Sequence, residues 1–409
     1  MKNLKLVTAL AASVALPSAG FATELEVTHW WTSGGEAAAV AELAKAFDAG
    51  GDKWVDGAIA GGGSTARPIM ISRITGGDPM GATQFNHGQQ ALELVEAGLM
   101  LDLTDVAEAE GWKEKVFPPS LLEACTVDGR IYCAPVNIHS PEWLWLSNKA
   151  YADAGIPVPT NWNEFVASAP QLEAAGKIPL ALGNQAWQSN LAFGAITVAV
   201  AGLDIWKQVN VEKNMDVAAG PEMAAVFAAV GDARKLAAKS TVQDWNQATN
   251  LVLTGEAGGQ IMGDWAQGEF QVAGKVAGTD YTCLPGLGLN AYLSTGGDAF
   301  YFPKNDDPEI EAAQKRLAAL LVSPEVQVAF NLKKGSLPIR GDVDLAAAND
   351  CMKKGLEVLA GGNLLPTGDM TWSPDVVKQN EDLMVEFFKS DMAPEAAHAQ
   401  WVENLKSGL

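Results

Sequence analysis

Basic residues are scarce in this chain, whose 409 residues include 28 Lys and Arg against 49 Asp and Glu. The formal net charge of −21 leaves no basic footprint for a nucleic acid or for an anionic membrane surface. The sequence therefore excludes both as partners.

Histidine is also scarce, and the four histidines at positions 29, 87, 139 and 398 have no spacing typical of metal ligands. A Gly-rich segment at 60–64 precedes a predicted helix, but no Lys-Ser or Lys-Thr pair follows, which excludes a nucleotide P-loop. The chain has no Gly-x-Ser-x-Gly nucleophile motif. We expect neither a metal site nor a cofactor.

The first 22 residues have the pattern of an export signal. Lys2 and Lys5 precede an apolar stretch over 6–16, and small residues lie one and three positions before a cut after Ala22. The stretch is too short to span a membrane. Because the first cysteine is Cys125, we expect no lipid anchor at a mature N-terminal cysteine and a soluble protein outside the cytoplasm.

Four cysteines in an exported chain are typical of two disulfides, with three possible connectivities. Cys125 and Cys133 flank a hairpin signal around Asp128-Gly129, whose three-residue loop would place the two cysteines opposite each other. We favour Cys125–Cys133, which leaves Cys283–Cys351. Free buried thiols are the alternative.

Short extended runs alternate with helical patterns along the chain. The predicted strands cover 25–31 and 82–86, and the predicted helices cover 36–49, 65–74 and 89–97. Such alternation is typical of an α/β layer around a parallel sheet.

Three extended crossings separate the helix-rich stretches, at 131–148, at 291–303 and around 335–340. The chain is also longer than one hydrophobic core usually serves. We therefore expect two lobes, with the chain passing between them more than once.

Two adjacent tryptophans, Trp30 and Trp31, stand at the end of the first predicted strand. Adjacent side chains of a strand point to opposite faces, so the two indoles cannot both fill one core surface. They could occupy the two covered faces of an α/β sheet. Their place at the carboxyl end of a strand favours a ligand crevice, in which an indole stacks on the C–H groups of a sugar ring.

The rest of the chain carries five ordered motifs, at 95–104, 128–132, 144–149, 323–327 and 334–340. Their order and spacing resemble those of the sugar-binding proteins of ABC importers over nearly the whole chain after the signal. Within that family, the opening His29-Trp30-Trp31-Thr-Ser-Gly-Gly-Glu36 is similar to that of the periplasmic glucose and mannose binders.

The resemblance implies a periplasmic-binding-protein-like α/β fold of the type II, clam-like form, with two α/β lobes joined by hinge strands. It assigns 23–138 and 292–338 to the N-terminal lobe, and 139–291 and 339–409 to the C-terminal lobe. It also implies a periplasmic monomer that captures a sugar without chemical turnover, glucose or a related aldohexose first, and delivers it to an inner-membrane ABC permease.

In the N-terminal lobe the resemblance places Trp30, Trp31 and Glu36 at the sugar. Glu36 also fits a capping box with Ser33 at the start of a helix, and the two roles are compatible.

The second predicted strand supplies three further candidates, Gln84, Asn86 and His87. Gln84 and Asn86 project to the same side of that strand, where the family has sugar-contacting polar residues. Capping of the loop is the alternative role.

The remaining candidates are Trp265, Asp298 and Lys334. The family has an aromatic platform at the position of Trp265, for which packing beneath Phe270 is the alternative. Asp298 lies beside an apolar run and needs hydrogen-bond donors, which sugar hydroxyls supply. Lys334 matches a lysine that donates to sugar oxygens, with Lys333 as the alternative.

One departure from the family concerns the identity of the sugar. Close glucose binders carry a histidine in the segment matching 365–372, and this chain has none there. Asp369 or Trp372 could take its place, so mannose, galactose and a glucosyl disaccharide stay open beside glucose.

Two other functions remain open. One is the binding of an oligosaccharide or a glycosyl-polyol, and the other is an exported glycosidase that uses two of the many carboxylates. The whole-chain resemblance favours a binding protein over an enzyme.

Overall fold

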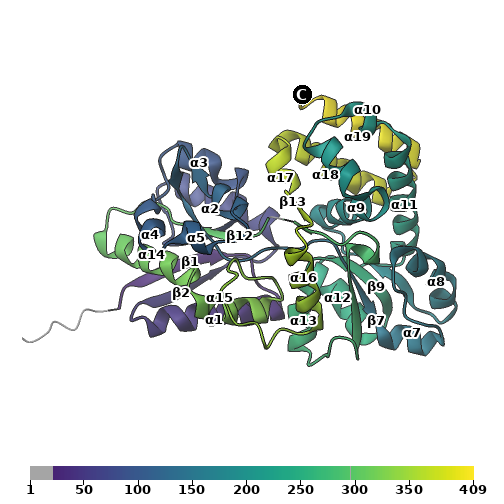
Figure 1. Ribbon diagram of the computed structural model, residues 1–409, viewed down its shortest axis with the longest axis horizontal. Helices are drawn as coiled ribbons and strands as arrows, with labels where there is room; N and C mark the ends of the chain where they lie inside the picture. Colours follow the sequence, from purple (N-terminus) through teal and green to yellow (C-terminus); the bar gives the residue numbers. More distant parts are fainter. Residues whose placement is uncertain (1–21, 295) are drawn as a thin grey trace, which may run out of the picture.

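The computed structural model describes residues 22–294 and 296–409, apart from the side chains of residues 368 and 369. Nearly all of the predicted export signal therefore lies outside the described residues. The described chain forms two lobes that lie side by side, each built on its own sheet (Figure 1). This arrangement confirms the expected two-lobed α/β fold.

The N-terminal lobe contains a five-stranded sheet of order β2-β1-β3-β12-β6. Its strands are β1 (Glu24–His29), β2 (Lys53–Ala58), β3 (Ala82–Asn86), β6 (Cys133–Pro135) and β12 (Asp298–Tyr301).

Both faces of this sheet are covered by helices, as β12 shows: Phe300 enters one core, whereas Ala299 and Tyr301 enter the other. The first core is covered by α1 (Gly34–Ala49), α14 (Pro308–Leu321) and α15 (Pro324–Lys334), and the second by α2 (Gly63–Thr75), α3 (Leu92–Glu96) and η1 (Gln89–Ala91). The lobe is completed by α4 (Thr104–Ala109), α5 (Trp112–Lys115), α6 (Ser120–Glu123), β4 (Thr126–Val127) and β5 (Arg130–Ile131).

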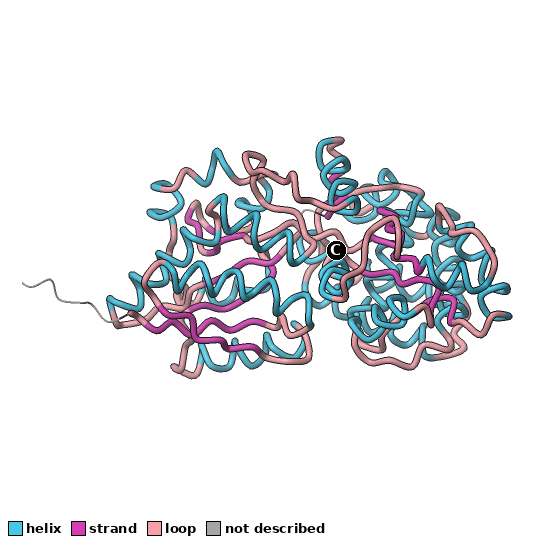
Figure 2. Tube along the Cα trace, turned by 90° about the horizontal axis from the view of Figure 1, so that it is seen from below, coloured by secondary structure: helices cyan, strands magenta, loops and turns pink. Residues whose placement is uncertain are grey.

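The C-terminal lobe contains a four-stranded sheet of order β10-β7-β9-β8, separate from the first sheet (Figure 2). Its strands are β7 (Trp143–Ser147), β8 (Ile178–Ala181), β9 (Ala257–Met262) and β10 (Tyr281–Pro285).

Helices of this lobe surround two cores. The larger core is covered by α7 (Asn148–Ala154), α8 (Trp162–Ala174), α9 (Ala186–Asn210), α10 (Met215–Ala218), α11 (Pro221–Ala237), α18 (Pro374–Lys389) and α19 (Pro394–Lys406). The smaller core is covered by α12 (Trp245–Thr254), α13 (Ala266–Val272) and α16 (Asp350–Ala360). Helix α9 is long and apolar enough to cross a membrane, but its side chains Phe193 and Ile196 are packed in the larger core.

Neither sheet is wholly parallel, which corrects the expectation from the sequence. β1 is parallel to β2 and β3, and β8 is parallel to β9. β12 is antiparallel to β3 and β6, and β7 is antiparallel to β9 and β10. The antiparallel strands β7 and β12 lie in the segments by which the chain crosses between the lobes. Neighbouring parallel strands need a long, usually helical, connection, and a strand that arrives from the other lobe does not have one.

The three predicted crossings meet between the lobes. Ile138 and Leu337 exchange backbone hydrogen bonds of 2.8 and 3.3 Å, and His139 N donates to Gly296 O at 2.9 Å. A small sheet of β11 (Leu293–Ser294) and β13 (Leu364–Leu365) adds to this hinge region. The lobe boundaries remain a prediction. Ile339, which the sequence assigns to the C-terminal lobe, packs in the core of the N-terminal lobe.

Both favoured disulfides, Cys125–Cys133 and Cys283–Cys351, are confirmed, and no described cysteine is free. The first closes the β4–β5 hairpin. Its loop has two residues, Asp128 and Gly129, rather than the expected three, and both adopt positive φ angles of 49° and 76°. Such angles are typical of the tight turns that match the twist of a hairpin.

The first strand ends two residues earlier than the sequence predicts. β1 stops at His29, so Trp30 and Trp31 lie in the connection that leads to α1. Helix α1 then begins with the predicted capping box, in which Ser33 Oγ accepts from Glu36 N. The chain thus places both indoles at the carboxyl end of a strand, next to a helix N-terminus.

Candidate functional site

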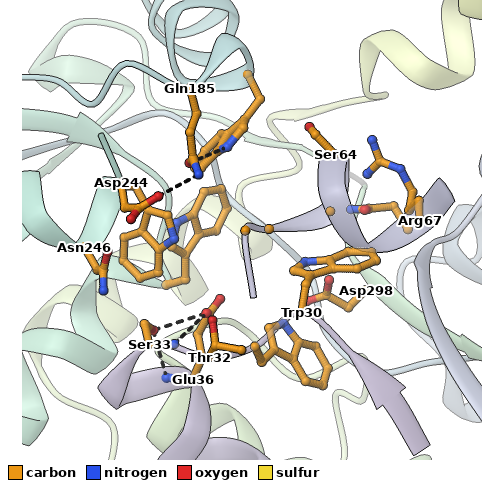
Figure 3. Close-up of a pocket in the computed structure, with 18 of the residues that line it drawn as sticks. Trp30, Thr32, Ser33, Glu36, Ser64, Arg67, Gln185, Asp244, Asn246 and Asp298 are labelled. Carbon is orange, nitrogen blue, oxygen red and sulfur yellow. Dashed lines mark hydrogen bonds between the residues drawn. The ribbon is translucent and has the colours of Figure 1, made fainter. Parts of the chain in front are cut away.

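A cleft of about 450 Å³ lies between the lobes, and residues from both lobes and from the hinge line it. This volume falls within the range of small-molecule sites, roughly 300–1,000 Å³. Figure 3 shows Asp244 and Asn246 of the C-terminal lobe across the cleft from Trp30 and Asp298.

The two adjacent tryptophans occupy different environments. Trp30 is partly buried, lines the cleft and carries Arg67 over its ring at 5.8 Å. Trp31 also borders the cleft but is only 1 % exposed, and its ring packs at 5.2–5.7 Å from Phe330 and Phe300. Trp30 therefore offers a surface to a ligand, whereas Trp31 joins the cleft wall to the core.

Glu36 and Lys334 form a buried ion pair in the cleft wall, with Lys334 Nζ donating to Glu36 Oε1 at 2.8 Å. The other oxygen of Glu36 accepts from Ser33 Oγ at 3.1 Å. Glu36 thus caps α1 and neutralises Lys334 at the same time. Lys333, the alternative in the sequence, is exposed and lines a different hollow.

Asp298 lies at the floor of the cleft and is 1 % exposed. Its carboxylate accepts from Gln84 Nε2 at 2.7 Å and from Asn137 Nδ2 at 3.0 Å, and it lies 2.7 Å from His139 Nε2. Burial raises the pKa of this carboxyl, but attraction to His139 and Lys334, together with the hydrogen bonds from His139 and Asn137, outweighs burial, so the pKa is lowered. Asp298 is therefore ionised and already supplied with donors.

Gln84 and His87 lie behind the cleft surface, whereas Asn86 lines it. Both polar atoms of the Gln84 amide are engaged, because its oxygen accepts from Trp30 N at 3.0 Å and its nitrogen donates to Asp298 at 2.7 Å. His87 is 3 % exposed, and neither ring nitrogen has a hydrogen-bond partner among the described residues. Burial, with a smaller effect of His139, lowers the pKa of His87 to about 4.

The C-terminal lobe contributes an aromatic wall. The ring of Trp265 lies 6.2 Å from that of Trp187 and 6.5 Å from that of Trp245, and all three line the cleft. The ring of His139 lies 5.0 Å from Trp265.

Beside this wall, Gln185 and Asp244 are joined by a hydrogen bond of 2.7 Å between Gln185 Nε2 and Asp244 Oδ1 (Figure 3). Asp244 is the N-cap residue of α12, and its backbone N–H donates to Gln247 Oε1 at 3.1 Å. Asn246 lies in the first turn of the same helix and faces the cleft.

Sequence reasoning missed His139, Trp187 and Trp245. Trp245 follows an N-cap signal, Asp244 with Gln247 three residues later, and helix N-termini of an α/β lobe often face its crevice. His139 had no local signal, because its importance comes from the crossing of the hinge segments.

Trp372 does not take the place of the histidine that close glucose binders have in this segment, because it is 8 % exposed and packs in the core of the C-terminal lobe. Its Nε1 donates to Asn210 Oδ1 at 2.9 Å. The side chain of Asp369 lies outside the described residues.

Among the described residues, no group of three His, Cys, Asp or Glu side chains could hold a metal ion. The charges that border the cleft floor are paired with each other, and the walls are aromatic on both sides. Such a cleft can enclose an uncharged ligand that has both apolar faces and hydroxyl groups.

The two hinged α/β lobes and the cleft between them define a solute-binding protein with the type II periplasmic-binding-protein fold. The chain belongs to the bacterial extracellular solute-binding protein family, whose model matches residues 31–328. Its fold and its relatives are those of solute-binding proteins and not of enzymes.

The chain is 37% identical over 366 residues to a "Probable sugar-binding periplasmic protein" of Rhizobium meliloti (strain 1021), covering 89% of this chain and 87% of the relative. Among solved structures, it is similar to a "Chitin oligosaccharide binding protein", with a TM-score of 0.76, 20% identity and coverage of 95% and 99% of the two chains. It is also similar to "Maltose bound T. maritima MalE3", with a TM-score of 0.75, 20% identity and coverage of 94% and 100%. Both solved structures share the fold of this chain.

Proposed function

We propose that this protein captures a neutral sugar in the periplasm and delivers it to the permease of an ABC importer. Glucose or a related aldohexose is the first candidate. The protein acts as a soluble monomer without a lipid anchor, and closure of its lobes around the sugar produces the form that the permease receives.

The observation that carries this proposal is the pairing of charges in the cleft. Asp298 is balanced by His139 and Lys334 is balanced by Glu36, so the charges at the floor of the cleft are paired with each other rather than left for an ionic ligand. On the C-terminal wall, Asp244 is hydrogen-bonded to Gln185. Sugar hydroxyls can still donate to and accept from these groups, since each oxygen of a carboxylate accepts more than one hydrogen bond.

Aromatic side chains on both walls support the same ligand class. Trp30 belongs to the N-terminal lobe and Trp265 to the C-terminal lobe, and both line the cleft. Each indole can stack on the C–H face of a pyranose ring without requiring a hydrogen bond. Closure would then bring apolar faces onto both sides of the sugar.

In this arrangement Trp30, Trp31, Glu36, Asn86, Trp265, Asp298 and Lys334 form the sugar site, and Gln84 and His87 support it from behind. The names of the relatives, probable sugar-binding periplasmic proteins, support the sugar and the periplasmic location.

Isothermal titration calorimetry with D-glucose, D-mannose and D-galactose tests the proposal. We expect saturable one-to-one binding of one of them and no change in the sugar recovered afterwards. Trp265→Ala should weaken binding about 10-fold or more through the lost stacking contact. Trp206→Ala is the matched control, because Trp206 is also partly buried but packs beside Tyr292 and Leu365.

Absence of binding for all sugars tested, or a conversion of the sugar, would contradict the proposal. Equal losses of affinity in Trp265→Ala and Trp206→Ala would remove Trp265 from the site.

A longer sugar is the second candidate, and the extent of the aromatic wall favours it. Trp187 and Trp245 continue the wall beyond Trp265, with Asn246 beside them. Maltose and D-glucose distinguish the candidates in the same calorimeter. Tighter binding of maltose, lost in Trp245→Ala, would indicate a second ring at this wall.

A further inference from the structure

His139 stands where the three hinge crossings meet. Its backbone N–H donates to Gly296 O at 2.9 Å, and the preceding residue, Ile138, pairs with Leu337. The backbone of His139 is therefore fixed by two other crossings, and its side chain lines the cleft between the lobes.

One nitrogen of the His139 ring is committed to Asp298. Nε2 lies 2.7 Å from Asp298 Oδ2, and this ionised carboxylate can only accept. Nε2 therefore carries the proton of that hydrogen bond. Asn137 Nδ2 donates to the same carboxylate oxygen at 3.0 Å and also lies 3.2 Å from His139 Nε2, so it borders both partners of this hydrogen bond.

The other nitrogen, Nδ1, is open to the cleft. The side chain of His139 is 15 % exposed, and Nδ1 forms no hydrogen bond with any described residue. Among the described residues, the buried polar atoms that lack a partner do not include this Nδ1, which agrees with a nitrogen that solvent can reach. The centroid of the His139 ring lies 5.0 Å from that of Trp265, so the imidazole borders the C-terminal aromatic wall.

Four titratable or charged groups face the imidazole. Asp298 and Asp264 are acidic, Lys334 is basic, and His87 is a second histidine. Burial lowers the pKa of His139, but attraction to Asp298 and Asp264 outweighs burial and the repulsion from Lys334, so the pKa is raised above its ordinary value of 6.5.

We propose that His139 binds the sugar directly, with Nδ1–H of its imidazolium donating to a sugar oxygen, and that sugar affinity therefore depends on pH. The proposal rests on the proposed function and names a contact within that site. It also gives the hinge a direct contact with the ligand, because the ring is carried by a crossing segment.

The sign of the pH dependence follows from the donor. Below the pKa of His139, Nδ1 carries a proton and donates. Above it, the carboxylate keeps the remaining proton on Nε2, and Nδ1 becomes an acceptor. Affinity should therefore fall as the pH rises through the pKa of His139, and bound sugar should move that pKa upward.

Nuclear magnetic resonance of the imidazole nitrogens tests this contact, since the chain has only four histidines. The full mature protein is titrated from pH 5 to 9 without sugar and with saturating D-glucose, or with D-mannose, D-galactose or maltose if calorimetry favours one of them. We expect the Nδ1 resonance and titration midpoint of His139 to shift when sugar binds. His398 is the internal control, because its Nε2 lies 2.7 Å from Ala218 O in the far part of the C-terminal lobe, and its signals should not move.

His139→Phe provides a second measurement, because it keeps a ring against Trp265 and removes both nitrogens. Binding should weaken about 10-fold to 100-fold at pH 6, the scale of a lost hydrogen bond to a charged donor. The pH dependence of the remaining affinity should disappear. If this variant does not fold, the resonance experiment on the native chain still decides.

Sugar binding that leaves both the His139 resonance and its midpoint unchanged would overturn this proposal alone. Failure of all four sugars to bind would overturn the proposed function and this contact with it.

Discussion

Two nearly buried aspartates beside the hinge differ in the number of hydrogen-bond donors around their carboxyl groups. Asp298, 1 % exposed, faces the donors Gln84, Asn137 and His139. Asp264, 4 % exposed, accepts from Ser140 N at 2.9 Å through one oxygen, and its other oxygen has no partner among the described residues.

The opposite pKa shifts of these two carboxyl groups follow from their partners. Burial acts on both in the same direction, yet the pKa of Asp298 is lowered while burial raises that of Asp264 to about 7. Both carboxyl oxygens of Glu142 lack a partner among the described residues, and its pKa is raised well above the ordinary value by burial and by repulsion from Asp264. Burial alone therefore does not decide the charge of a group, and the donors around it do.

The strongest test of this comparison is Asp298→Asn. It leaves the ring of His139 and the amide of Asn137 without the carboxylate that they contact, and we expect the free energy of unfolding to fall by about 3–5 kcal/mol. Sugar affinity should fall as well, because the floor of the cleft loses its acceptor. Urea unfolding and calorimetry measure the two effects.

Asp52→Asn is the matched control for Asp298→Asn. Asp52 is 7 % exposed and accepts from Nε and Nη2 of Arg316 at 2.6 and 2.8 Å, away from the cleft. The Asp52→Asn variant should be less stable than the native protein and should bind the sugar with unchanged affinity. A loss of affinity in this control equal to that of Asp298→Asn would remove the special role of Asp298.

The second test uses neighbouring lysines. Lys334→Met leaves Glu36 without its cation and should lower the free energy of unfolding by about 2–3 kcal/mol, less than the first variant because Ser33 still donates to Glu36. Lys333→Met, at an exposed position, should change it by less than about 0.5 kcal/mol. Similar losses in the two variants would show that Lys334 is not paired in solution.

The third test addresses Asp264, the aspartate with one oxygen that has no partner among the described residues. Because the pKa of Asp264 rises from its ordinary 3.8 to about 7 on folding, the native chain is favoured below the ordinary pKa and loses stability as the pH rises through about 7. Asp264→Asn removes this loss, so its stability relative to the native chain should increase from pH 5 to pH 8 by at most about 3 kcal/mol. Urea unfolding at the two pH values measures the difference, and a constant difference would mean that Asp264 does not titrate in this range.

Among the four tests, leaving the control variants aside, the smallest effect is expected for Glu142→Gln. The carboxyl group of Glu142 is held neutral by burial, so the substitution replaces one neutral polar group with another. We expect the free energy of unfolding at pH 7 to change by less than about 1 kcal/mol. A loss as large as that of Asp298→Asn would show that Glu142 is ionised and paired.

Much of the fold was predictable because its signals are local. The strand at Ala82–Asn86, the capping box of Ser33 and Glu36, and the pairing of Cys125 with Cys133 each depend on residues within a few positions of one another. The direction of the sheet strands was not predictable in this way, because antiparallel pairing arises from crossings that are far apart in the chain.

In the candidate site, too, local signals were predictable and contacts between distant segments were not. Asp298, Lys334 and Trp265 stood out by resemblance, and all three line the cleft. Gln84 and Glu36 were candidates as well, but their pairing was not predicted: Gln84 is 214 positions from Asp298, and Glu36 is 298 positions from Lys334. No local pattern records such pairs.

The sequence by itself determined an exported, acidic, two-lobed chain with two disulfides and a pair of tryptophans at the end of its first strand, because charge, periodicity and cysteine spacing act locally. Only the tertiary structure decided that Trp30 faces the cleft while Trp31 closes the core behind it. It also decided which buried carboxylates stay charged, since the hinge brings donors from distant segments to Asp298 and leaves one oxygen of Asp264 without a partner among the described residues.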